Sequence, residues 1–320
     1  MKILGTGSCL PKRELTNDQI SEFVDTNSEW ISTRTGILSR HVCTDEKLSD
    51  LAYEASLKAL EMAEIKAKDL DAIICTTVGG EFITPALSCI LNKKLEVECR
   101  SFDLNGACSG FIYGMEVAQT FFESGRASKI LLVGAENMTG FADWTDRSTC
   151  VLFGDGAGAF VLEGDKEEEL LSILVTAKGD ESLLNIPRKK GNSPFLTDKE
   201  SKEQFLYMNG REVYKFAVAS ICNDLEKVII DAKITPEDID YVILHQANMR
   251  IIAAAQKRLT IPAEKYLSNI EHCGNTSSAS IPILVDESAR KGLFKKGDVL
   301  LLSAFGGGLT TAACVIKWSI

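Results

Sequence analysis

The sequence predicts an α/β protein made of one structural unit that occurs twice. Three observations support this: strand-like apolar runs along the chain, helical stretches between them, and similar segments at a constant spacing. Continuous apolar runs separated by helices are typical of a buried sheet that is covered on both faces. With 320 residues, 45% of them hydrophobic, the chain is long enough for two such units.

Six apolar runs are predicted as strands. They occupy residues 71–77, 129–136, 157–164, 240–246, 298–305 and 311–318. Each contains at least four consecutive apolar residues, as in "KILLVGAE" and "DVLLLSAF". Runs of this length, bounded by charged or glycine residues, favour buried strands.

Similar segments recur at a spacing of 169 residues. Asp-Leu-Asp at 69–71 precedes one predicted strand, and Asp-Ile-Asp at 238–240 precedes another. "KILLVGA" from Lys129 is likewise matched, 169 residues later, by "DVLLLSA" from Asp298. Two matches at one spacing indicate an internal duplication.

The duplication divides the chain into an N-terminal half, residues 1–168, and a C-terminal half, residues 169–320. Around the boundary, at about 165–210, the chain is polar and contains "NIPRKKGNSPFLTDKES". We expect a loop excursion there rather than a core element. The same spacing relates Cys108 in the first half to Ser277 in the second.

Composition excludes several classes of function. The net charge of −10 disfavours nucleic-acid binding, and no apolar run approaches the roughly 18 to 20 residues that span a membrane. The start, "MKILGTGSCLP", lacks a signal-peptide pattern, and none of the ten cysteines forms a CxxC pair. Neither "GTGSCLP" nor "GDGAGAF" fits a dinucleotide or P-loop fingerprint, and no cluster has metal-ligand spacing. We therefore expect a cytoplasmic protein with reduced thiols, no metal and no cofactor.

Cys108 lies among small residues in "DLNGACSGFIYGM", at the start of a predicted helix with apolar positions Phe111, Ile112 and Met115. Packing is one interpretation, because small residues let elements approach closely and a buried cysteine behaves as a small hydrophobe. Chemistry is the other, because the N–H groups and partial positive charge of a helix N-terminus favour a thiolate. This stretch by itself leaves both open.

His245 is the histidine best placed for chemistry. It follows the predicted strand "YVIL", opens the helical pattern "HQANMRIIAAAQKRL", and corresponds to Thr76 at the 169-residue spacing. Sites in open α/β sheets lie beyond the carboxyl ends of strands. A histidine at such a junction can instead be satisfied by a backbone carbonyl. His41 and His272 are interpreted as a surface residue and a structural residue.

Four motifs in this order, "NGACSGF", "HQAN", "GNTSSASIP" and "AFGGG", resemble the active-site motifs of β-ketoacyl-acyl carrier protein synthase III, a member of the thiolase superfamily. Residues 25–37 and 146–162 also match that family's early and middle segments. The resemblance implies a duplicated thiolase-like fold, layered α/β/α/β/α, and usually a homodimer. It implies an acyltransferase (EC 2.3.1 class) that initiates type II fatty acid synthesis. Acetyl-CoA or another short acyl-CoA would condense with malonyl-acyl carrier protein and release carbon dioxide.

The resemblance places the nucleophile at Cys108, with His245 and Asn275 beside it. Acyl transfer to a thiolate splits the condensation into two steps, and we expect the helix start and a nearby imidazole to lower the pKa of the thiol. Loss of carbon dioxide then leaves an enolate, which neutral His245 and the Asn275 amide would stabilise. Backbone N–H groups of Cys108 and, by resemblance, Gly307 would hold the tetrahedral oxyanion. Taken alone, "GGG" also fits a flexible turn.

The resemblance also identifies residues that would bind CoA. Trp30 and Arg147 match positions that hold the adenine between a flat ring and a planar guanidinium. Arg34 would meet a CoA phosphate, and Asn248 would bond the pantetheine arm. Without the resemblance, a core position fits Trp30 as well.

A basic stripe is predicted beside the site. Arg250, Lys257 and Arg258 fall at i, i+7 and i+8 on one helix face, and Lys215 is expected to join them. On an acidic chain such a stripe suggests an acidic partner, which the resemblance identifies as the acyl carrier protein. A solvated helix face is the other interpretation.

Departures from the family pattern leave the acyl specificity open. They lie at Gly106, Ser148, Leu309 and Thr311. A related acyltransferase that uses another acceptor, a condensing enzyme of secondary metabolism and a carrier-binding subunit without activity are alternatives. Asn275 argues against the acyltransferase, because it supplies the second enolate donor, and an intact Cys108 argues against the inactive subunit.

Overall fold

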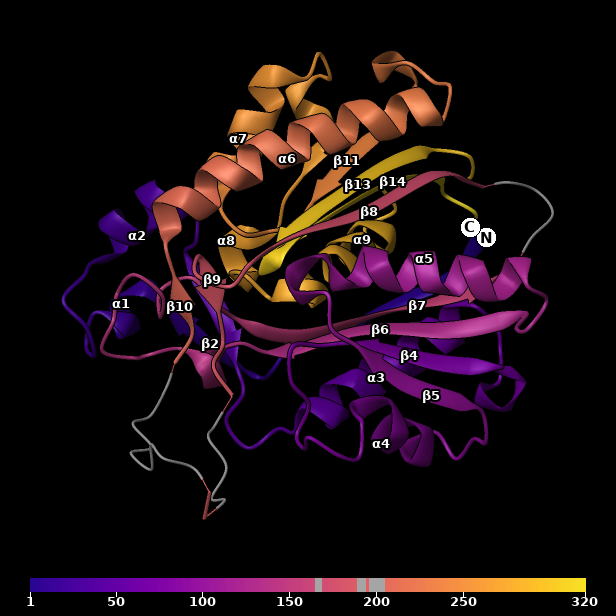
Figure 1. Cartoon of the computed structure of the whole chain (residues 1–320), viewed down its shortest axis with the longest axis horizontal. Helices are drawn as coiled ribbons and strands as arrows, with labels where there is room; N and C mark the ends of the chain where they lie inside the picture. Colours follow the sequence, from indigo (N-terminus) through magenta and orange to yellow (C-terminus); the bar gives the residue numbers. More distant parts are fainter. Residues whose placement is uncertain (165–168, 189–193, 196–204) are drawn as a thin grey trace.

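The computed structural model describes residues 1–164, 169–188, 194–195 and 205–320. Figure 1 shows two sheets stacked on each other, with helices between them and on both outer faces. The layers are therefore helix, sheet, helix, sheet and helix. This confirms the α/β class and the layered core predicted from the sequence.

The first sheet comes from the N-terminal half of the chain. Its strand order is β1-β7-β6-β4-β5. The bounds are β1 (Lys2–Cys9), β4 (Ala72–Thr76), β5 (Arg100–Leu104), β6 (Lys129–Asn137) and β7 (Asp155–Glu163). β4 runs parallel to β5 and β6, while β7 runs antiparallel to β1 and β6.

The second sheet comes from the C-terminal half and repeats this topology. Its order is β12-β11-β13-β14-β8. The bounds are β8 (Leu170–Asp180), β11 (Tyr241–Leu244), β12 (Tyr266–Leu267), β13 (Val299–Gly306) and β14 (Gly308–Lys317). β11 runs parallel to β12 and β13, and β14 runs antiparallel to β8 and β13. Each strand thus has a counterpart in the first sheet, as the duplication predicts.

Two equivalent helices, α5 (Gly110–Glu123) and α9 (Ser280–Arg290), fill the middle layer. Phe111, Ile112 and Met115 of α5 are at most 1% exposed, because elements of both halves cover them. The outer helices are α3 (Leu48–Met62) and α4 (Leu87–Lys94) on the first sheet, and α6 (Gly210–Asp231) and α7 (Met249–Arg258) on the second. No helix of the described ranges is long and apolar enough to cross a membrane.

Shorter elements surround this core. The remaining helices are α1 (Asn17–Ile20), α2 (Ser28–Thr35) and α8 (Ile270–Cys273). The remaining strands are β2 (Arg13–Thr16), β3 (Ser39–Val42), β9 (Leu184–Asn185) and β10 (Tyr207–Met208), and they form two small antiparallel pairs. Short 3₁₀ turns are η1 (Ala67–Asp69), η2 (Ala107–Ser109), η3 (Thr139–Phe141), η4 (Pro236–Asp238), η5 (Ala263–Lys265) and η6 (Ser277–Ala279).

The expected excursion at about 165–210 is wrong for residues 170–180. These form β8, which pairs with β14 at the edge of the second sheet. The strand escaped prediction because its second half is exposed and polar, as an edge strand allows. The proposed boundary between the halves adjoins residues 165–168, which lie outside the described residues, so its position stays a prediction.

Backbone hydrogen bonds also correct one repeat match. Asp71 N donates to Lys129 O in the first half, and Asp240 N donates to Val299 O in the second. Lys129 therefore corresponds to Val299, 170 residues later, and not to Asp298. The second half has one extra residue between these strands, because connecting segments accept insertions that paired strands do not.

Candidate active site

Cys108 lies at the start of a helix and on the wall of a cavity of about 980 Å³. It belongs to η2, which continues directly into α5. A Cβ on Gly306 would lie 2.6 Å from Cys108 N, so only glycine lets the end of β13 approach Cys108. Gly307, the next residue, also lines the cavity. The small residues thus serve close packing, and Cys108 remains part of the cavity wall.

His245 follows β11 and is 1% exposed. Its Nδ1 lies 2.7 Å from Ser280 Oγ, and the same hydroxyl accepts the Gln246 N–H at 3.4 Å. We assign the Ser280 hydroxyl as the donor to Nδ1, which leaves its oxygen to accept from Gln246 and places the ring hydrogen on Nε2. Nε2 has no hydrogen-bond partner among the described residues, and His245 lines the cavity. Burial lowers the pKa of His245 to about 3, so the ring is neutral and Nε2–H is available as a donor.

Asn275 offers a second donor. Its Oδ1 accepts the Ser277 N–H at 2.9 Å, which leaves the amide N–H groups for the cavity that Asn275 lines. Two backbone bonds fix the residue to the N-terminal half: Asn275 N donates to Leu152 O at 2.8 Å, and Gly154 N donates to Asn275 O at 3.1 Å. The structure therefore brings Cys108, His245 and Asn275 to one cavity.

The expected lowering of the thiol pKa is wrong. Burial raises the pKa of Cys108 to about 12, and the negative charge of Glu136 adds to this effect. Hydrogen bonds from the Ser277 side chain and the backbone act in the opposite direction but are weaker. Neutral His245 contributes no positive charge. Cys108 is thus a thiol rather than a thiolate.

The structural counterpart of Cys108 is Ser278, not Ser277. Ala107 N donates to Asn105 Oδ1 at 3.1 Å, just as Ser277 N donates to Asn275 Oδ1. Ala107 and Ser277 also share a left-handed backbone, with φ of 47° and 49°. The two sites therefore match at a spacing of 170, because the extra residue of the second half precedes them.

The residues predicted to hold the CoA adenine lie together on the cavity wall. The guanidinium carbons of Arg34 and Arg147 lie 4.8 and 5.0 Å from the Trp30 ring centroid. An adenine between Trp30 and Arg147 needs about 7 Å, which is two stacking contacts of about 3.5 Å. For an adenine to fit, the Arg147 side chain must therefore leave its 2.8 Å hydrogen bond to Asp25 O and move away from Trp30. Trp30 is half-buried rather than a core residue.

The cavity wall is rich in cations. The basic residues that line it are Arg34, Arg147, Arg211, Lys215 and Arg250. Asn248 also lines it, and its Oδ1 caps α7 by accepting the Arg250 N–H at 2.9 Å. The side-chain amide nitrogen of Asn248 takes no part in this cap.

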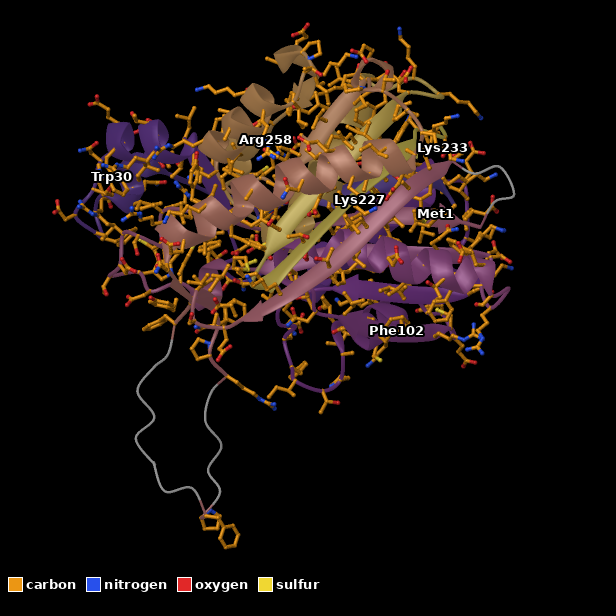
Figure 2. All side chains as sticks on the ribbon, turned by 45° about the horizontal axis from the view of Figure 1, so that its top comes forward. Met1, Trp30, Phe102, Lys227, Lys233 and Arg258 are labelled. Carbon is orange, nitrogen blue, oxygen red and sulfur yellow. The ribbon has the colours of Figure 1, made fainter. Side chains whose placement is uncertain are left out.

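The predicted basic stripe is exposed, but its members differ. Arg250 lies on the cavity wall, whereas Lys257 and Arg258 lie farther along α7. Arg258 is 3.7 Å from Glu226 of α6, and Lys215 is 2.7 Å from Glu212, so both charges are partly balanced. Figure 2 shows Trp30 at the left of the molecule and Arg258 on the helical layer nearer its centre.

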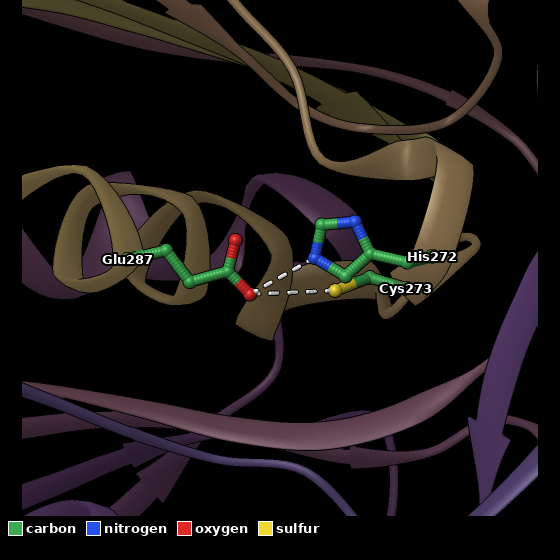
Figure 3. Close-up of side chains that lie close together, drawn as sticks. All are labelled: His272, Cys273 and Glu287. Atoms are coloured by element: carbon green, nitrogen blue, oxygen red, sulfur yellow. Dashed lines mark hydrogen bonds and ion pairs between the residues drawn. The ribbon is translucent and has the colours of Figure 1, made fainter. Parts of the chain in front are cut away.

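His272 does not line this cavity, and its side chain contacts Glu287. Figure 3 shows His272 and Cys273 of α8 directed toward Glu287 of α9, at 3.3 and 3.8 Å. Their ligand-type atoms lie close enough together for a metal ion, but burial and Glu287 raise the pKa of Cys273 well above its usual range. A thiolate ligand is therefore disfavoured, and the ion pair joins α8 to α9 just before Asn275. His41, expected at the surface, is half-buried, with Nδ1 2.7 Å from Pro11 O.

Sequence reasoning missed several residues of the site. Ser280 orients His245, Arg211 lines the cavity, and Phe305 packs edge-on against the His245 ring at 5.5 Å. Glu136 was missed as well, although an acidic residue at the end of the apolar run "KILLVGA" is a usable signal. The others carry no signal that a single sequence would reveal.

Comparisons with known proteins agree with this arrangement. The family model for 3-oxoacyl-[acyl-carrier-protein (ACP)] synthase III matches residues 102–179, and the model for its C-terminal part matches residues 229–318. A β-ketoacyl-[acyl-carrier-protein] synthase III of Clostridium acetobutylicum is 41% identical over 100% of this chain and 99% of its own length. One from Xanthomonas campestris pv. campestris is 44% identical over 99% of this chain and 98% of its own.

Solved structures give the same result for the fold. The 3-oxoacyl-[acyl-carrier-protein] synthase III of Aquifex aeolicus has a TM-score of 0.92 and 41% identity, with 99% of each chain covered. The priming β-ketosynthase of the R1128 polyketide biosynthetic pathway also reaches 0.92, at 32% identity over 99% of this chain and 96% of its own.

Proposed function

This chain belongs to the β-ketoacyl-acyl carrier protein synthase III family, and we propose from this membership that Cys108 takes an acyl group from acyl-CoA and condenses it with malonyl-acyl carrier protein. The chain is an acyltransferase of the condensing type that acts in fatty acid biosynthesis. A role in secondary metabolism is not favoured, because the full-length relatives at 41–44% identity are named β-ketoacyl-[acyl-carrier-protein] synthase III. One observation supports the residue assignment: Cys108, His245 with its unpartnered ring nitrogen among the described residues, and Asn275 with its amide nitrogen all line the same cavity.

In the first step, the Cys108 sulfur attacks the thioester carbonyl carbon of the acyl-CoA. The carbonyl oxygen gains negative charge, which the N–H groups of Cys108 and Gly307 stabilise. Collapse of this intermediate expels CoA, which takes up the proton that the thiol loses, and leaves a thioester on Cys108. The cations of the cavity wall bind the CoA phosphates, and Trp30 stacks on the adenine once Arg147 moves aside.

In the second step, malonyl-acyl carrier protein loses carbon dioxide and forms an enolate. His245 Nε2–H and the Asn275 amide donate to the enolate oxygen, where the new charge develops. The neutral state of His245 suits this role, because a donor is needed and no proton has to be removed. The enolate carbon then attacks the acyl-Cys108 carbonyl and gives the β-ketoacyl product.

We propose further that the basic stripe on α7 docks the acidic carrier protein, that the chain forms a homodimer and that it works in the cytoplasm. Exposed Phe82 and Ile83, at 58% and 79%, support an interface on the loop after β4. The proposed steps use side chains and backbone N–H groups and require no cofactor. The acyl group is proposed to be acetyl or another short chain.

Mass spectrometry tests this function directly. The protein is incubated with a panel of acyl-CoAs, and the intact mass and the modified peptide are measured. Malonyl-acyl carrier protein is then added, and release of carbon dioxide and of β-ketoacyl product is followed. One acyl group on Cys108 that disappears as product forms supports the proposal. An acyl group on another cysteine, or transfer to a different acceptor without carbon dioxide release, would contradict it.

A further inference from the structure

Glu136 is a buried acid that the proposed steps leave unused. It lies near the end of β6 and is 0% exposed. Among the described residues, no basic side chain lowers its pKa. A buried carboxyl without a counter-ion is costly, so its presence here calls for a reason.

The two carboxyl oxygens of Glu136 join both halves of the chain. Oε2 accepts the Val78 N–H at 3.0 Å and the Thr77 hydroxyl at 3.3 Å, both from the segment after β4. Oε1 accepts the Ser277 hydroxyl at 3.0 Å and the Ser278 hydroxyl at 2.7 Å, both from η6. Bonds to an ionised acceptor are short and strong. Glu136 therefore ties η6 of the C-terminal half to two segments of the N-terminal half.

The turn η6 in its place supports Asn275. Ser277 N donates to Asn275 Oδ1 at 2.9 Å, and this bond decides which end of the amide is left for the cavity. Ser277 has a left-handed backbone with φ of 49°, a region that serine rarely occupies. The bond from its hydroxyl to Glu136 holds Ser277 in this conformation. The carboxylate thus fixes the direction of the Asn275 amide through a single intervening residue.

The internal duplication shows that this arrangement belongs to the second half alone. At the 170-residue spacing of the paired strands, Glu136 near the end of β6 corresponds to Gly306 at the end of β13. Gly306 faces Cys108 and has no side chain, and a Cβ there would lie 2.6 Å from Cys108 N. Glu136 faces Ser278, the counterpart of Cys108, and fills the equivalent space with a carboxylate. The first half therefore carries the thiol on the cavity wall, and the second half carries a bonded turn that supports its neighbours.

We propose that Glu136 is a positioning residue for decarboxylation, which holds Ser277 and thereby aims the Asn275 amide at the enolate oxygen. This inference rests on the proposed role of Asn275 as an enolate donor. Glu136 is not among the residues that line the cavity, so it acts through η6 and touches no substrate. Its contribution is preorganisation, because a donor that is already aimed needs no rearrangement when the charge develops.

Variants of Glu136 test this role through two rates measured on each protein, carbon dioxide release from malonyl-acyl carrier protein and single-turnover loading of acetyl-CoA. Glu136→Ala should slow carbon dioxide release roughly 30-fold, which is part of the roughly 100- to 1000-fold that complete loss of a donor costs. Glu136→Gln should stay within about fivefold of the wild type, since the side chain keeps its shape and the serine hydroxyls can turn to accept its N–H groups. Loading should stay within about threefold in both variants, because Glu136 raises rather than lowers the pKa of the Cys108 thiol.

A double-mutant cycle with Asn275 separates positioning from a general structural role. In the Asn275→Ala background the donor that Glu136 aims is absent. Glu136→Ala should therefore slow carbon dioxide release less than about twofold there, against roughly 30-fold in the wild-type background. If the same 30-fold loss persisted in the Asn275→Ala background, the inference would be overturned.

Ser277→Ala tests the same connection without removing the buried acid. The variant should fold, because Ala107 adopts the equivalent left-handed backbone with φ of 47°. It should slow carbon dioxide release roughly tenfold, and this loss should also vanish in the Asn275→Ala background.

Thr77→Val is the matched control, because it removes a bond to Oε2 and leaves the bonds between Oε1 and η6. Its carbon dioxide release should stay within about threefold of the wild type even where thermal unfolding shows a loss of stability. Release that is as slow in Thr77→Val as in Ser277→Ala, or undiminished in Glu136→Ala, would overturn the inference. Absence of carbon dioxide release in the wild type would refute the proposed function itself, and the inference with it.

Discussion

Replacement of Asn275 by alanine should separate decarboxylation from acyl loading. The amide nitrogen is the part of the side chain left for the cavity, because Oδ1 is held by Ser277 N at 2.9 Å. Loss of one preorganised donor to a developing oxyanion costs about 2.7–4 kcal/mol, which is roughly 100- to 1000-fold in rate. Carbon dioxide release from malonyl-acyl carrier protein should fall by this factor. Loading should fall much less, since Asn275 is not among the groups that shift the pKa of the Cys108 thiol.

The alanine variant also removes an acceptor, so a control is needed. Ser277 N–H loses its partner in Asn275→Ala, which costs about 1–3 kcal/mol of stability and can displace Ser277. Asn275→Asp keeps an oxygen for Ser277 N–H but aims a second oxygen at the enolate. It should therefore load acetyl-CoA at nearly the wild-type rate while decarboxylation near pH 8 falls at least as far as in the alanine variant.

The assay measures both half-reactions on each protein. Intact-mass spectrometry follows acyl-enzyme formation in a single turnover, and labelled carbon dioxide from malonyl-acyl carrier protein follows decarboxylation. The reasoning is refuted if Asn275→Ala or Asn275→Asp loses loading and keeps decarboxylation. It is also refuted if Asn275→Asp decarboxylates as fast as the wild type, because the amide donor would then be dispensable.

Three further predictions address the nucleophile, the docking surface and the buried histidine. Cys108→Ser should abolish acyl loading, and peptide mapping that finds the acyl group on another cysteine would refute the assignment. Lys257→Glu should raise the KM for malonyl-acyl carrier protein roughly fivefold and leave acyl-CoA loading unchanged, since Lys257 is exposed but off the cavity wall. Arg250→Glu, which changes a residue of the cavity wall, is the comparison. If Lys257→Glu impaired loading as much as it impaired the reaction with malonyl-acyl carrier protein, docking would be refuted. The folded-state pKa of His245 is about 3, below its unfolded value of about 6.5, so its contribution to stability is present at pH 7 and lost as pH falls. Between pH 7 and pH 5, protonation of His245 should lower the free energy of unfolding by about 2 kcal/mol. Urea titrations of the wild type and of His245→Asn should resolve this difference, and an identical pH dependence in both proteins would refute the prediction.

Elements with a strong local signal could be predicted from the sequence. All six predicted strands, from 71–77 to 311–318, became β4, β6, β7, β11, β13 and β14 of the two sheets. Their signal is a continuous apolar run, which exists only where both faces of a sheet are covered. β1, β5, β8 and β12 escaped prediction, because they lie at sheet edges and are short or partly polar.

The sequence by itself also determined which residues would meet. Cys108, His245 and Asn275 lie in motifs at strand ends and helix starts, and a duplicated α/β fold brings such junctions together. The repeat spacing was correct only to within one residue, so it assigned Ser277 instead of Ser278 as the counterpart of Cys108. Differences in the length of connecting segments are invisible in weakly similar halves but decide which residues correspond after them.

Tertiary structure alone decided the protonation of the site. The hydroxyl that fixes the His245 ring comes from Ser280, 35 residues away, and the acid that bonds Ser277 comes from Glu136, 141 residues away. The helix start at Cys108 suggested a lowered thiol pKa, yet the pKa is raised, because desolvation outweighs the local dipole. Desolvation depends on everything that packs around a group, and that environment is assembled from distant segments that no local pattern records.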